Sequence, residues 1–231
     1  MRWGRSSVAR ATPPPTLDAE ASFALQPGDV IVGLDEVGRG SWAGPLSVGA
    51  VALRWPPQPQ PDGLADSKLL SPRRREALIE PIRRWADASS VGSASNHECD
   101  ALGMTEATAL AILRALDALH LEEPPTVLLL DGVVDPLTNR LDFAPYAGAR
   151  VITMAGADRT SAVVAAASVL AKVTRDAAMV ALDASFPAYG FSSNKGYPCA
   201  VHRMALLGYG LTSLHRRSWR FTDEWVVGAP A

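Results

Sequence analysis

Apolar residues along the chain form two patterns, short continuous runs and residues at helical spacing. The short runs predict strands. Short runs of branched apolar residues bounded by glycine or proline have the length and composition of buried strands. They predict strands at residues 30–35, 46–54, 126–130 and 151–154, and a segment near residues 89–95 supplies another.

The second pattern is apolar residues at helical spacing. Ser71 and Pro72 occupy the favoured cap and first-turn positions of one helix. Its apolar face would be formed by Leu78, Ile79, Ile82 and Trp85. A second helix is expected at about residues 105–119. The alanine-rich residues 161–184 are apolar nearly all round, which predicts a helix buried against the sheet.

Three of the predicted strands stop at or shortly before an acidic residue. Asp35 ends the first strand and Glu36 follows it, Asp131 follows residues 126–130, and Asp158 comes soon after residues 151–154. Ligands of open α/β sheets collect at the carboxyl ends of strands, so these carboxylates are expected to converge. Because carboxylates repel one another unless a cation neutralises them, a convergent cluster indicates hard divalent ions with oxygen ligands.

Glycines flank an arginine directly after the first two acids, at Gly38, Arg39 and Gly40. Glycine lets the main chain approach a ligand closely, and arginine supplies a fixed fork of donors for phosphate. The alternative interpretation is a tight turn between two strands. The segment lacks the Gly-Lys-Ser/Thr sequence of a nucleotide-binding P-loop.

The segment Asp35-Glu36-Val37-Gly38-Arg39-Gly40 resembles the amino-terminal signature of ribonuclease HII, a type 2 ribonuclease H. Further blocks resemble the family and follow its order: Asp66-Ser67-Lys68, Leu130-Asp131-Gly132, the segment from Asp158 to Asp176, Tyr189-Gly190-Phe191, Lys195-Gly196-Tyr197 and His215-Arg216-Arg217-Ser218. The match runs from about Asp29 to Trp219. Blocks in the right order are specific as a set, whereas any one of them alone would be weak evidence.

The resemblance implies an α/β, ribonuclease H-like fold, in which the strands at residues 30–35, 46–54 and 89–95 would form an antiparallel meander. Its mixed five-stranded sheet would be flanked by helices and followed by a small helical C-terminal extension. Residues 26–226 would form a single catalytic domain, with the helical part at about residues 196–226. Residues 1–25 are expected to form a disordered tail, and residues 227–231 a second tail.

The resemblance also implies an endonuclease that hydrolyses the RNA strand of RNA/DNA hybrids. It would nick 5′ of single ribonucleotides in duplex DNA and leave 5′-phosphate and 3′-hydroxyl ends. Two Mg²⁺ or Mn²⁺ ions would be held by Asp35, Glu36, Asp131 and Asp158, with Asp35 bridging both. The backbone of Gly38, Arg39 and Gly40 would read the 2′-hydroxyl, and Tyr197 would pack on the following sugar. The remaining substrate contacts are expected from Lys68, Ser168, Lys172, Lys195 and Arg217.

Several alternatives stay open. Asp135, Asp142 and Asp176 compete with Asp158 for the fourth acidic position, and Tyr197 could be an ordinary half-buried tyrosine. Asn194 and Pro198-Cys199 replace the family's usual His and Gly-Thr. A ribonuclease HIII-like enzyme is a second candidate, but relatives of that type carry a substantial amino-terminal binding domain. A catalytically silent hybrid-binding subunit is a third, although it would gain nothing from clustered charges that repel phosphate.

Charge composition gives limited information about where nucleic acid would bind. The formal net charge is −2, so any nucleic-acid-binding face must be local. The three lysines, Lys68, Lys172 and Lys195, all lie inside the family blocks. The run Arg73-Arg74-Arg75 is read as a solvated charge run or as a contact to a nucleic-acid backbone, and Arg216-Arg217 is the better candidate for such a contact.

The remaining features concern compartment and assembly. No apolar stretch reaches the roughly 18–20 residues of a membrane span, and the amino terminus lacks the apolar core of a secretory signal. Cys99 and Cys199 are expected to be free thiols of a reducing cytoplasm. His97, His202 and His215 are expected to be structural or surface residues. The family resemblance favours a monomer.

Overall fold

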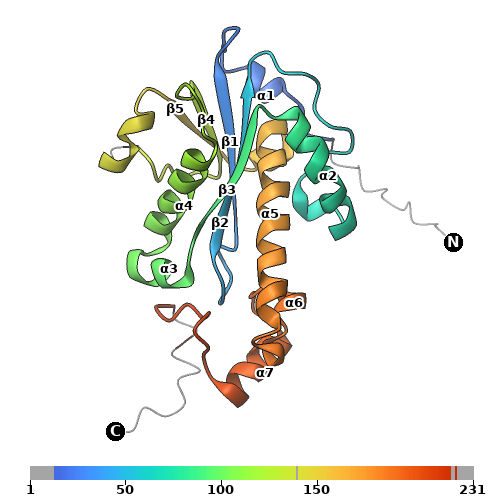
Figure 1. The fold of residues 1–231 in the computed structure, drawn as a ribbon, viewed down its shortest axis with the longest axis vertical. Helices are drawn as coiled ribbons and strands as arrows, with labels where there is room; N and C mark the ends of the chain where they lie inside the picture. Colours follow the sequence, from blue (N-terminus) through green and yellow to red (C-terminus); the bar gives the residue numbers. More distant parts are fainter. Residues whose placement is uncertain (1–12, 139, 220–221, 223–231) are drawn as a thin grey trace, which may run out of the picture.

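A mixed five-stranded sheet forms the centre of the computed structural model, which describes residues 13–138, 140–219 and 222 (Figure 1). The strand order is β3-β2-β1-β4-β5. Strands β1, β2 and β3 are antiparallel, whereas β1, β4 and β5 run parallel. The strand bounds are Val30–Val37 (β1), Leu46–Arg54 (β2), Ala88–Ala94 (β3), Val127–Asp131 (β4) and Arg150–Met154 (β5). The predicted strands and the antiparallel meander are confirmed.

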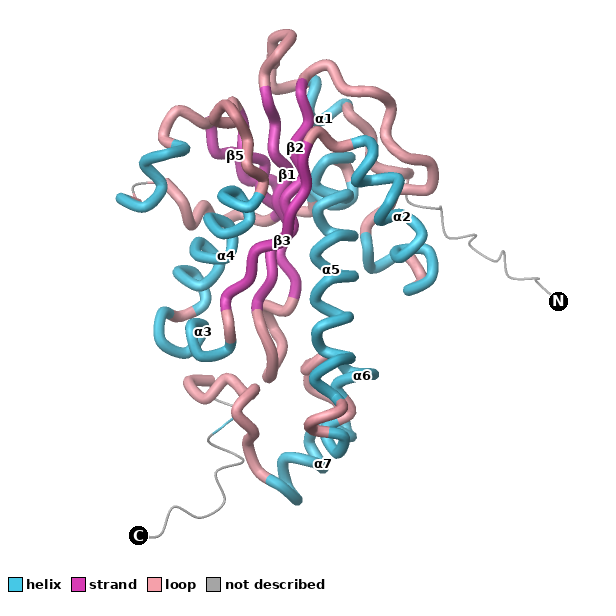
Figure 2. The backbone as a smooth tube through the Cα atoms, viewed as in Figure 1, coloured by secondary structure: helices cyan, strands magenta, loops and turns pink. Residues whose placement is uncertain are grey.

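Helices cover both faces of this sheet (Figure 2). Helices α3 (Asn96–Leu102) and α4 (Met104–Ala118) lie on one face, and α2 (Pro72–Trp85) and α5 (Ala162–Asp183) lie on the other. Side chains alternate along β1 accordingly, since Ile31 packs in the α5-side core and Val32 in the α4-side core. The period-2 pattern of the strand therefore fills two separate cores.

Helix α5 is the long element that connects the sheet to the C-terminal part of the molecule (Figure 1). Ser161 caps its first turn by accepting from the backbone N–H of Val164. Its first half is buried, as predicted from the alanine-rich sequence. A Cβ atom built on Gly49 of β2 would lie 2.1 Å from the carbonyl oxygen of Ala167, so only glycine lets α5 approach this closely. No helix among the described residues is long and apolar enough to cross a membrane.

Beyond the sheet, helices α6 (Phe191–Asn194) and α7 (Ala200–Tyr209) surround the distal end of α5. A third apolar cluster holds this part together, with Phe191 and Leu206 among its buried members. His202 and His215 are both buried, and their Nε2 atoms are 2.9 Å apart. Burial lowers the pKa of His215 to about 3, so the imidazoles form a neutral hydrogen-bonded pair. Both are therefore structural, and Cys99 and Cys199 are free thiols.

The amino-terminal segment differs from the expectation. Residues 13–25 were predicted to belong to a disordered tail, but they pack against the sheet domain and include the short helix α1 (Asp18–Ala21). Leu25 joins the apolar core on the α5 side, and the carboxylate of Glu20 is buried at the first turn of α5. The prediction is wrong for these residues because their partners lie far away in sequence. Residues 1–12 and 227–231, predicted as tails, lie outside the described residues.

Candidate functional site

Sheet topology brings the first two acidic positions together. In the parallel β1–β4 ladder Leu34 pairs with Leu130, so Asp35 and Asp131 occupy the next positions on adjacent strands. Asp158 lies in the 3-10 turn η3 (Ala157–Arg159), four residues beyond the end of β5. The backbone N–H of Ala157 donates to Asp131 Oδ1 at 2.8 Å, which ties this turn to the end of β4. Three strand ends thus deliver acids to one edge of the sheet.

The acidic side chains at this edge influence one another's charge. Burial raises the pKa of Asp35 to about 7, and the charges of Asp131, Glu36 and Asp158 add to that rise. A hydrogen bond from Ser168 opposes it. Burial also raises the pKa values of Glu36 and Asp131, with the charge of Asp158 raising that of Asp131 further. The site therefore holds an excess of negative charge in a desolvated position.

A lysine partly neutralises this excess. Lys68 Nζ donates to Asp158 Oδ2 at 2.9 Å and lies 4.0 Å from Asp66 Oδ1. Despite partial burial of its ammonium group, these carboxylates raise the pKa of Lys68. The Lys68 side chain is 67% exposed, so it can leave Asp158 without disturbing the core. Asp66 is itself buried, and it accepts from the backbone N–H of Lys68 and forms an ion pair with Arg159 at 3.5 Å.

The donor chemistry of this edge fits divalent cations. Carboxylate oxygens are the ligands of Mg²⁺ and Mn²⁺, and mutual repulsion among buried carboxylates favours a bound cation. No three acidic, histidine or cysteine side chains in the described part of the chain form a ready-made metal cage. The ion pair with Lys68 turns the carboxylate of Asp158 to an ammonium group. The arrangement resembles an exchangeable site more than a closed structural one.

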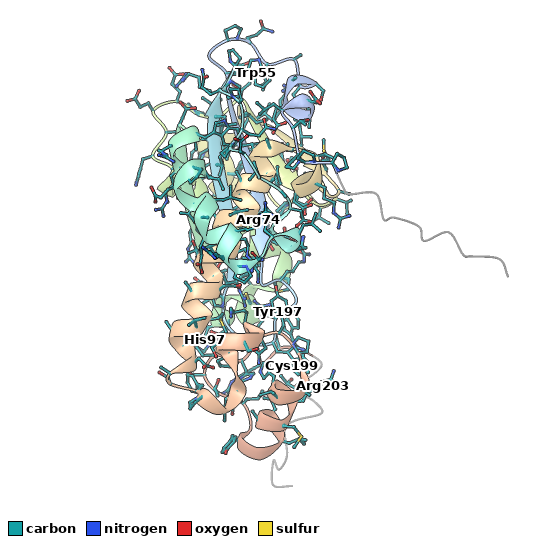
Figure 3. The ribbon with its side chains drawn as sticks, turned by 90° about the vertical axis from the view of Figure 1, so that its right-hand side faces the viewer. Trp55, Arg74, His97, Tyr197, Cys199 and Arg203 are labelled. Carbon is teal, nitrogen blue, oxygen red and sulfur yellow. The ribbon has the colours of Figure 1, made fainter. Side chains whose placement is uncertain are left out.

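Next to the acids, the loop after β1 forms one wall of a cavity of about 320 Å³. Gly38 has a φ of +87°, a conformation that disfavours any side chain, and its N–H donates to the hydroxyl of Tyr197 at 3.0 Å. Figure 3 shows Tyr197 where the sheet domain meets the C-terminal helices. The cavity is lined by Asp35, Glu36, Val37, Gly38, Arg39, Gly40, Ser67, Lys68, Asp131, Ser168, Lys172 and Tyr197. Most of the predicted site residues thus share one cavity.

Two buried arginines hold the loop from beneath. Arg216 donates to the carbonyl oxygens of Gly38, Arg39 and Gly44 at 2.7, 2.8 and 3.2 Å. Arg175 donates to the carbonyl oxygens of Pro45 and Lys195 and to Ser41 Oγ, at 2.7, 2.9 and 2.8 Å. Its guanidinium also lies 5.5 Å from the ring centroid of Tyr197. Main-chain oxygens, not carboxylates, compensate these charges.

This arrangement corrects one expectation. Arg216 was a candidate for contacting a nucleic-acid backbone, but it is fully buried and its donors bind loop carbonyls. Arg175 was missed by the sequence reasoning altogether. The available signal was a charged residue in an otherwise apolar helix, one turn after Lys172.

Not every predicted substrate residue lies in the cavity. Lys195 instead lines a separate groove between α2 and α5, and its ammonium group binds the carbonyl oxygen of Ser192. Arg217 is exposed, and its backbone N–H donates to Asp100 Oδ2 at 2.7 Å. Lys172 lines the cavity and pairs with Asp176 at 2.8 Å. The roles of Lys195 and Arg217 stay predictions.

The three competitors for the fourth acidic position bind other residues, and Asp176 pairs with Lys172 at 2.8 Å. Asp135 accepts from the backbone N–H groups of Leu137 and Thr138. Asp142 is exposed and pairs with Arg140 at 2.8 Å. Of the four aspartates, Asp158 is the one whose charge raises the pKa of both Asp35 and Asp131.

The unusual residues near Tyr197 have a local structural role. Asn194 Oδ1 accepts from the N–H of Gly196 at 2.8 Å, and its Nδ2 donates to the carbonyl oxygen of Tyr189 at 2.7 Å. Cys199 precedes α7, and its Sγ lies 3.5 Å from the backbone nitrogen of His202. These contacts fix the turn that presents Tyr197, so the departures from the family pattern are compatible with a formed site.

Comparisons with known proteins identify the family and the fold. The family model described as Ribonuclease HII matches residues 32–222. Ribonuclease HII of Streptomyces avermitilis is 45% identical over 213 residues, which cover 91% of this chain and 85% of that protein. Ribonuclease H2 from Pyrococcus horikoshii superposes with a TM-score of 0.69 at 28% identity, covering 84% of this chain and 96% of that chain.

A more distant neighbour supports the fold alone. The structure of Bst ribonuclease HIII in complex with Mn²⁺ has a TM-score of 0.67 at 20% identity, and covers 89% of this chain and 71% of that chain. The ribonuclease H-like fold is thus confirmed. With a family match over most of its length and a curated relative at 45% identity, the chain belongs to the ribonuclease HII family and is a ribonuclease H enzyme.

Proposed function

We propose that this ribonuclease H hydrolyses the RNA strand of RNA/DNA hybrids and also nicks 5′ of single ribonucleotides in duplex DNA. It would use Mg²⁺ or Mn²⁺ and leave 5′-phosphate and 3′-hydroxyl ends. The observation that carries the proposal is the hydrogen bond between Gly38 N–H and the Tyr197 hydroxyl, on the rim of the cavity that Asp35, Glu36 and Asp131 line. A backbone donor, an aromatic ring and the acids thus face one space.

The acidic residues Asp35, Glu36, Asp131 and Asp158 would hold the metal ions. When bound, such ions activate a water, orient the scissile phosphate and stabilise the leaving oxygen. The raised pKa of Asp35 supports this role, because a cation would favour its ionised form and displace the proton. Lys68 would then be released from Asp158 and become available to a substrate phosphate.

Recognition of RNA requires groups that sense the 2′-hydroxyl. The main chain of Gly38, Arg39 and Gly40 lines the cavity with no side chain on either glycine, so a sugar can approach it closely. The Tyr197 ring, held by Arg175 and by Gly38, would pack on the sugar of the next nucleotide. Ser168 and Lys172 line the same cavity and would face the phosphates.

The test is cleavage of end-labelled duplex DNA that contains one ribonucleotide, beside an all-RNA/DNA hybrid, with Mg²⁺, Mn²⁺ or chelator. Metal-dependent nicking on the 5′ side of the lone ribonucleotide is expected. Cleavage of the long hybrid alone would favour ribonuclease HIII-like specificity. Binding of both duplexes without cleavage would favour a silent binding subunit.

Tyr197 variants sharpen this test. Tyr197→Ala removes the ring and is expected to reduce cleavage at a single ribonucleotide severely while long hybrids are cut more nearly normally. Tyr197→Phe keeps the ring and loses only the acceptor for Gly38 N–H, so it should retain most junction cleavage. Full junction activity in Tyr197→Ala would remove Tyr197 from the recognition site.

A further inference from the structure

The buried carboxylate of Glu20 lies at the beginning of helix α5. Its side chain is 0% exposed. One oxygen, Oε1, accepts from Ser161 Oγ at 2.8 Å and from the backbone N–H of Val163 at 2.9 Å. A negative charge at this position also complements the positive end of a 22-residue helix.

Main-chain hydrogen bonds fasten the same segment on both sides of Ser161. The N–H of Thr16 donates to the carbonyl oxygen of Thr160 at 3.2 Å, and the N–H of Ala162 donates to the carbonyl oxygen of Thr16 at 2.9 Å. Residues 15–20 thus run beside residues 160–163. We call residues 15–20 the amino-terminal strap.

The strap holds the chain immediately after the Asp158 turn. Ser161 N–H donates to the carbonyl oxygen of Ala157 at 2.8 Å, which closes the turn around Asp158. The N–H of the same Ala157 binds Asp131 Oδ1 at 2.8 Å. A displacement of Ser161 is therefore expected to shift Asp158 directly and Asp131 through Ala157.

Packing alone is a poor explanation for a glutamate at this position. Glu20 Oε2 is buried without a hydrogen-bond partner, and desolvation raises the pKa of the carboxyl group. An unsatisfied buried polar atom costs on the order of 1–3 kcal/mol. An apolar side chain would avoid that cost but would leave Ser161 and Val163 without this acceptor.

We propose that the amino-terminal strap positions the Asp158 turn and that Glu20 is its positioning residue. The inference rests on the proposed function, since it assigns the strap to the same metal-binding edge. The strap precedes residues 32–222, the part of the chain that matches the family.

The experiment compares four variants of the full chain. Glu20→Ala removes the acceptor, and Glu20→Asp shortens it by one methylene so that it cannot reach both donors. Glu20→Gln keeps Oε1 and serves as the rescue. Glu123→Asp is the matched control, because it makes the same change as Glu20→Asp at an exposed position outside the strap. The measurements are kcat and KM on an RNA/DNA hybrid, the half-saturating Mg²⁺ concentration, and amide hydrogen exchange of residues 156–161 in the free protein.

For Glu20→Ala and Glu20→Asp we expect kcat to fall about tenfold or more, since small misplacements of catalytic groups are that costly. KM should stay unchanged, the half-saturating Mg²⁺ concentration should rise, and the turn at residues 156–161 should exchange faster. Glu20→Gln should behave like the wild-type protein. If Glu20→Ala does not fold, Glu20→Asp carries the comparison.

The inference is overturned if Glu20→Asp matches Glu123→Asp in kcat, Mg²⁺ dependence and hydrogen exchange. It is also overturned if the lower kcat reflects only a smaller fraction of active protein molecules. Titration with a tight-binding duplex measures that fraction. Failure of the wild-type protein to cleave either duplex would instead reject the proposed function. Hydrogen exchange at residues 156–161 would still test the strap in that case.

Discussion

The chain builds the two charged sides of the site in opposite ways: an acidic wall that lines the cavity, and a pair of buried arginines beneath the loop after β1, which we call the basic wall. On the acidic wall, Asp35 and Asp131 are desolvated beside like charges, and their pKa values are raised. On the basic wall, Arg175 and Arg216 are fully buried, yet carbonyl oxygens accept most of their N–H groups. The acidic wall is electrostatically unsatisfied, and the basic wall is a hydrogen-bonded scaffold.

This difference separates two kinds of functional residue. Unsatisfied carboxylates can exchange protons, the Lys68 ammonium group and cations, so that wall is suited to chemistry. The guanidinium groups of Arg175 and Arg216 cannot leave their acceptors without leaving buried carbonyls unpaired, so that wall keeps its shape. Neutral substitutions on the acidic wall should therefore raise the stability of the fold and abolish activity. Substitutions on the basic wall should lower the stability of the fold.

The largest expected effect is on the acidic wall. Asp131→Asn keeps the shape of the side chain but removes a charge, and we expect turnover to fall by about a thousandfold or more, equivalent to about 4 kcal/mol. Binding of the hybrid in Ca²⁺ should persist. Single-turnover cleavage and fluorescence anisotropy measure the two quantities. An active variant would show that the metal site has been misplaced.

Asp35→Asn should show the stability cost of the acidic wall. The pKa of Asp35 is raised from 3.8 to about 7 in the folded protein, so its contribution to stability is present below pH 4 and lost as pH rises through 7. In chelator at pH 8, Asp35→Asn should therefore be more stable than the wild-type protein by on the order of 4 kcal/mol, with little difference at pH 4.

Urea unfolding at several pH values measures this effect. If the difference in unfolding free energy between the two proteins does not change with pH, the buried charge of Asp35 does not destabilise the fold. Adding Mg²⁺ at pH 8 should reduce the difference in unfolding free energy, because a cation that binds the folded wild-type protein stabilises it.

On the basic wall, Arg175→Lys should lower stability. A lysine ammonium cannot reach Pro45, Lys195 and Ser41 together, so buried acceptors lose their donors at a cost of about 3 kcal/mol. Arg203→Lys is the matched control, because Arg203 is exposed and stacks over Trp42. Equal stability of the two variants would remove the scaffold role from Arg175.

The smallest effect is expected outside both walls. Arg73 and Arg74 are exposed at the first turn of α2, where Figure 3 labels Arg74, whereas Arg75 binds the carbonyl oxygens of Ser67 and Leu70. If Arg73 and Arg74 form a solvated charge run, Arg73→Ala and Arg74→Ala should leave the salt dependence of hybrid binding unchanged. If they bind phosphates, each loss should reduce the slope of log K against log salt by about 0.9.

Some elements of the fold were predictable because their signals are local. Each apolar run carries its own strand signal, and Ser71 and Pro72 mark the start of α2. The convergence of Asp35 and Asp131 followed from one rule, that parallel neighbouring strands end at the same edge. The order of the family blocks supplied the remaining expectations about the site.

Other contacts depend on residues that are distant in sequence. Lys68 and Asp158 are 90 positions apart, and Glu20 and Ser161 are 141 positions apart. Neither pair leaves a local pattern, so residues 13–25 were mistaken for a tail and the ion pair was not foreseen. Arg216 was read as a surface cation for the same reason, since only the folded loop supplies its acceptors.

The sequence by itself therefore determined the strands, the main helices, the family and the acids near the carboxyl ends of β1 and β4. Tertiary structure decided which charges are neutralised, which arginines are buried, and that residues 15–20 bind the first turn of α5. The physical reason is that the spacing of apolar residues within a short segment determines its secondary structure. The burial and hydrogen bonding of a charged side chain depend on all the segments that surround it in the fold.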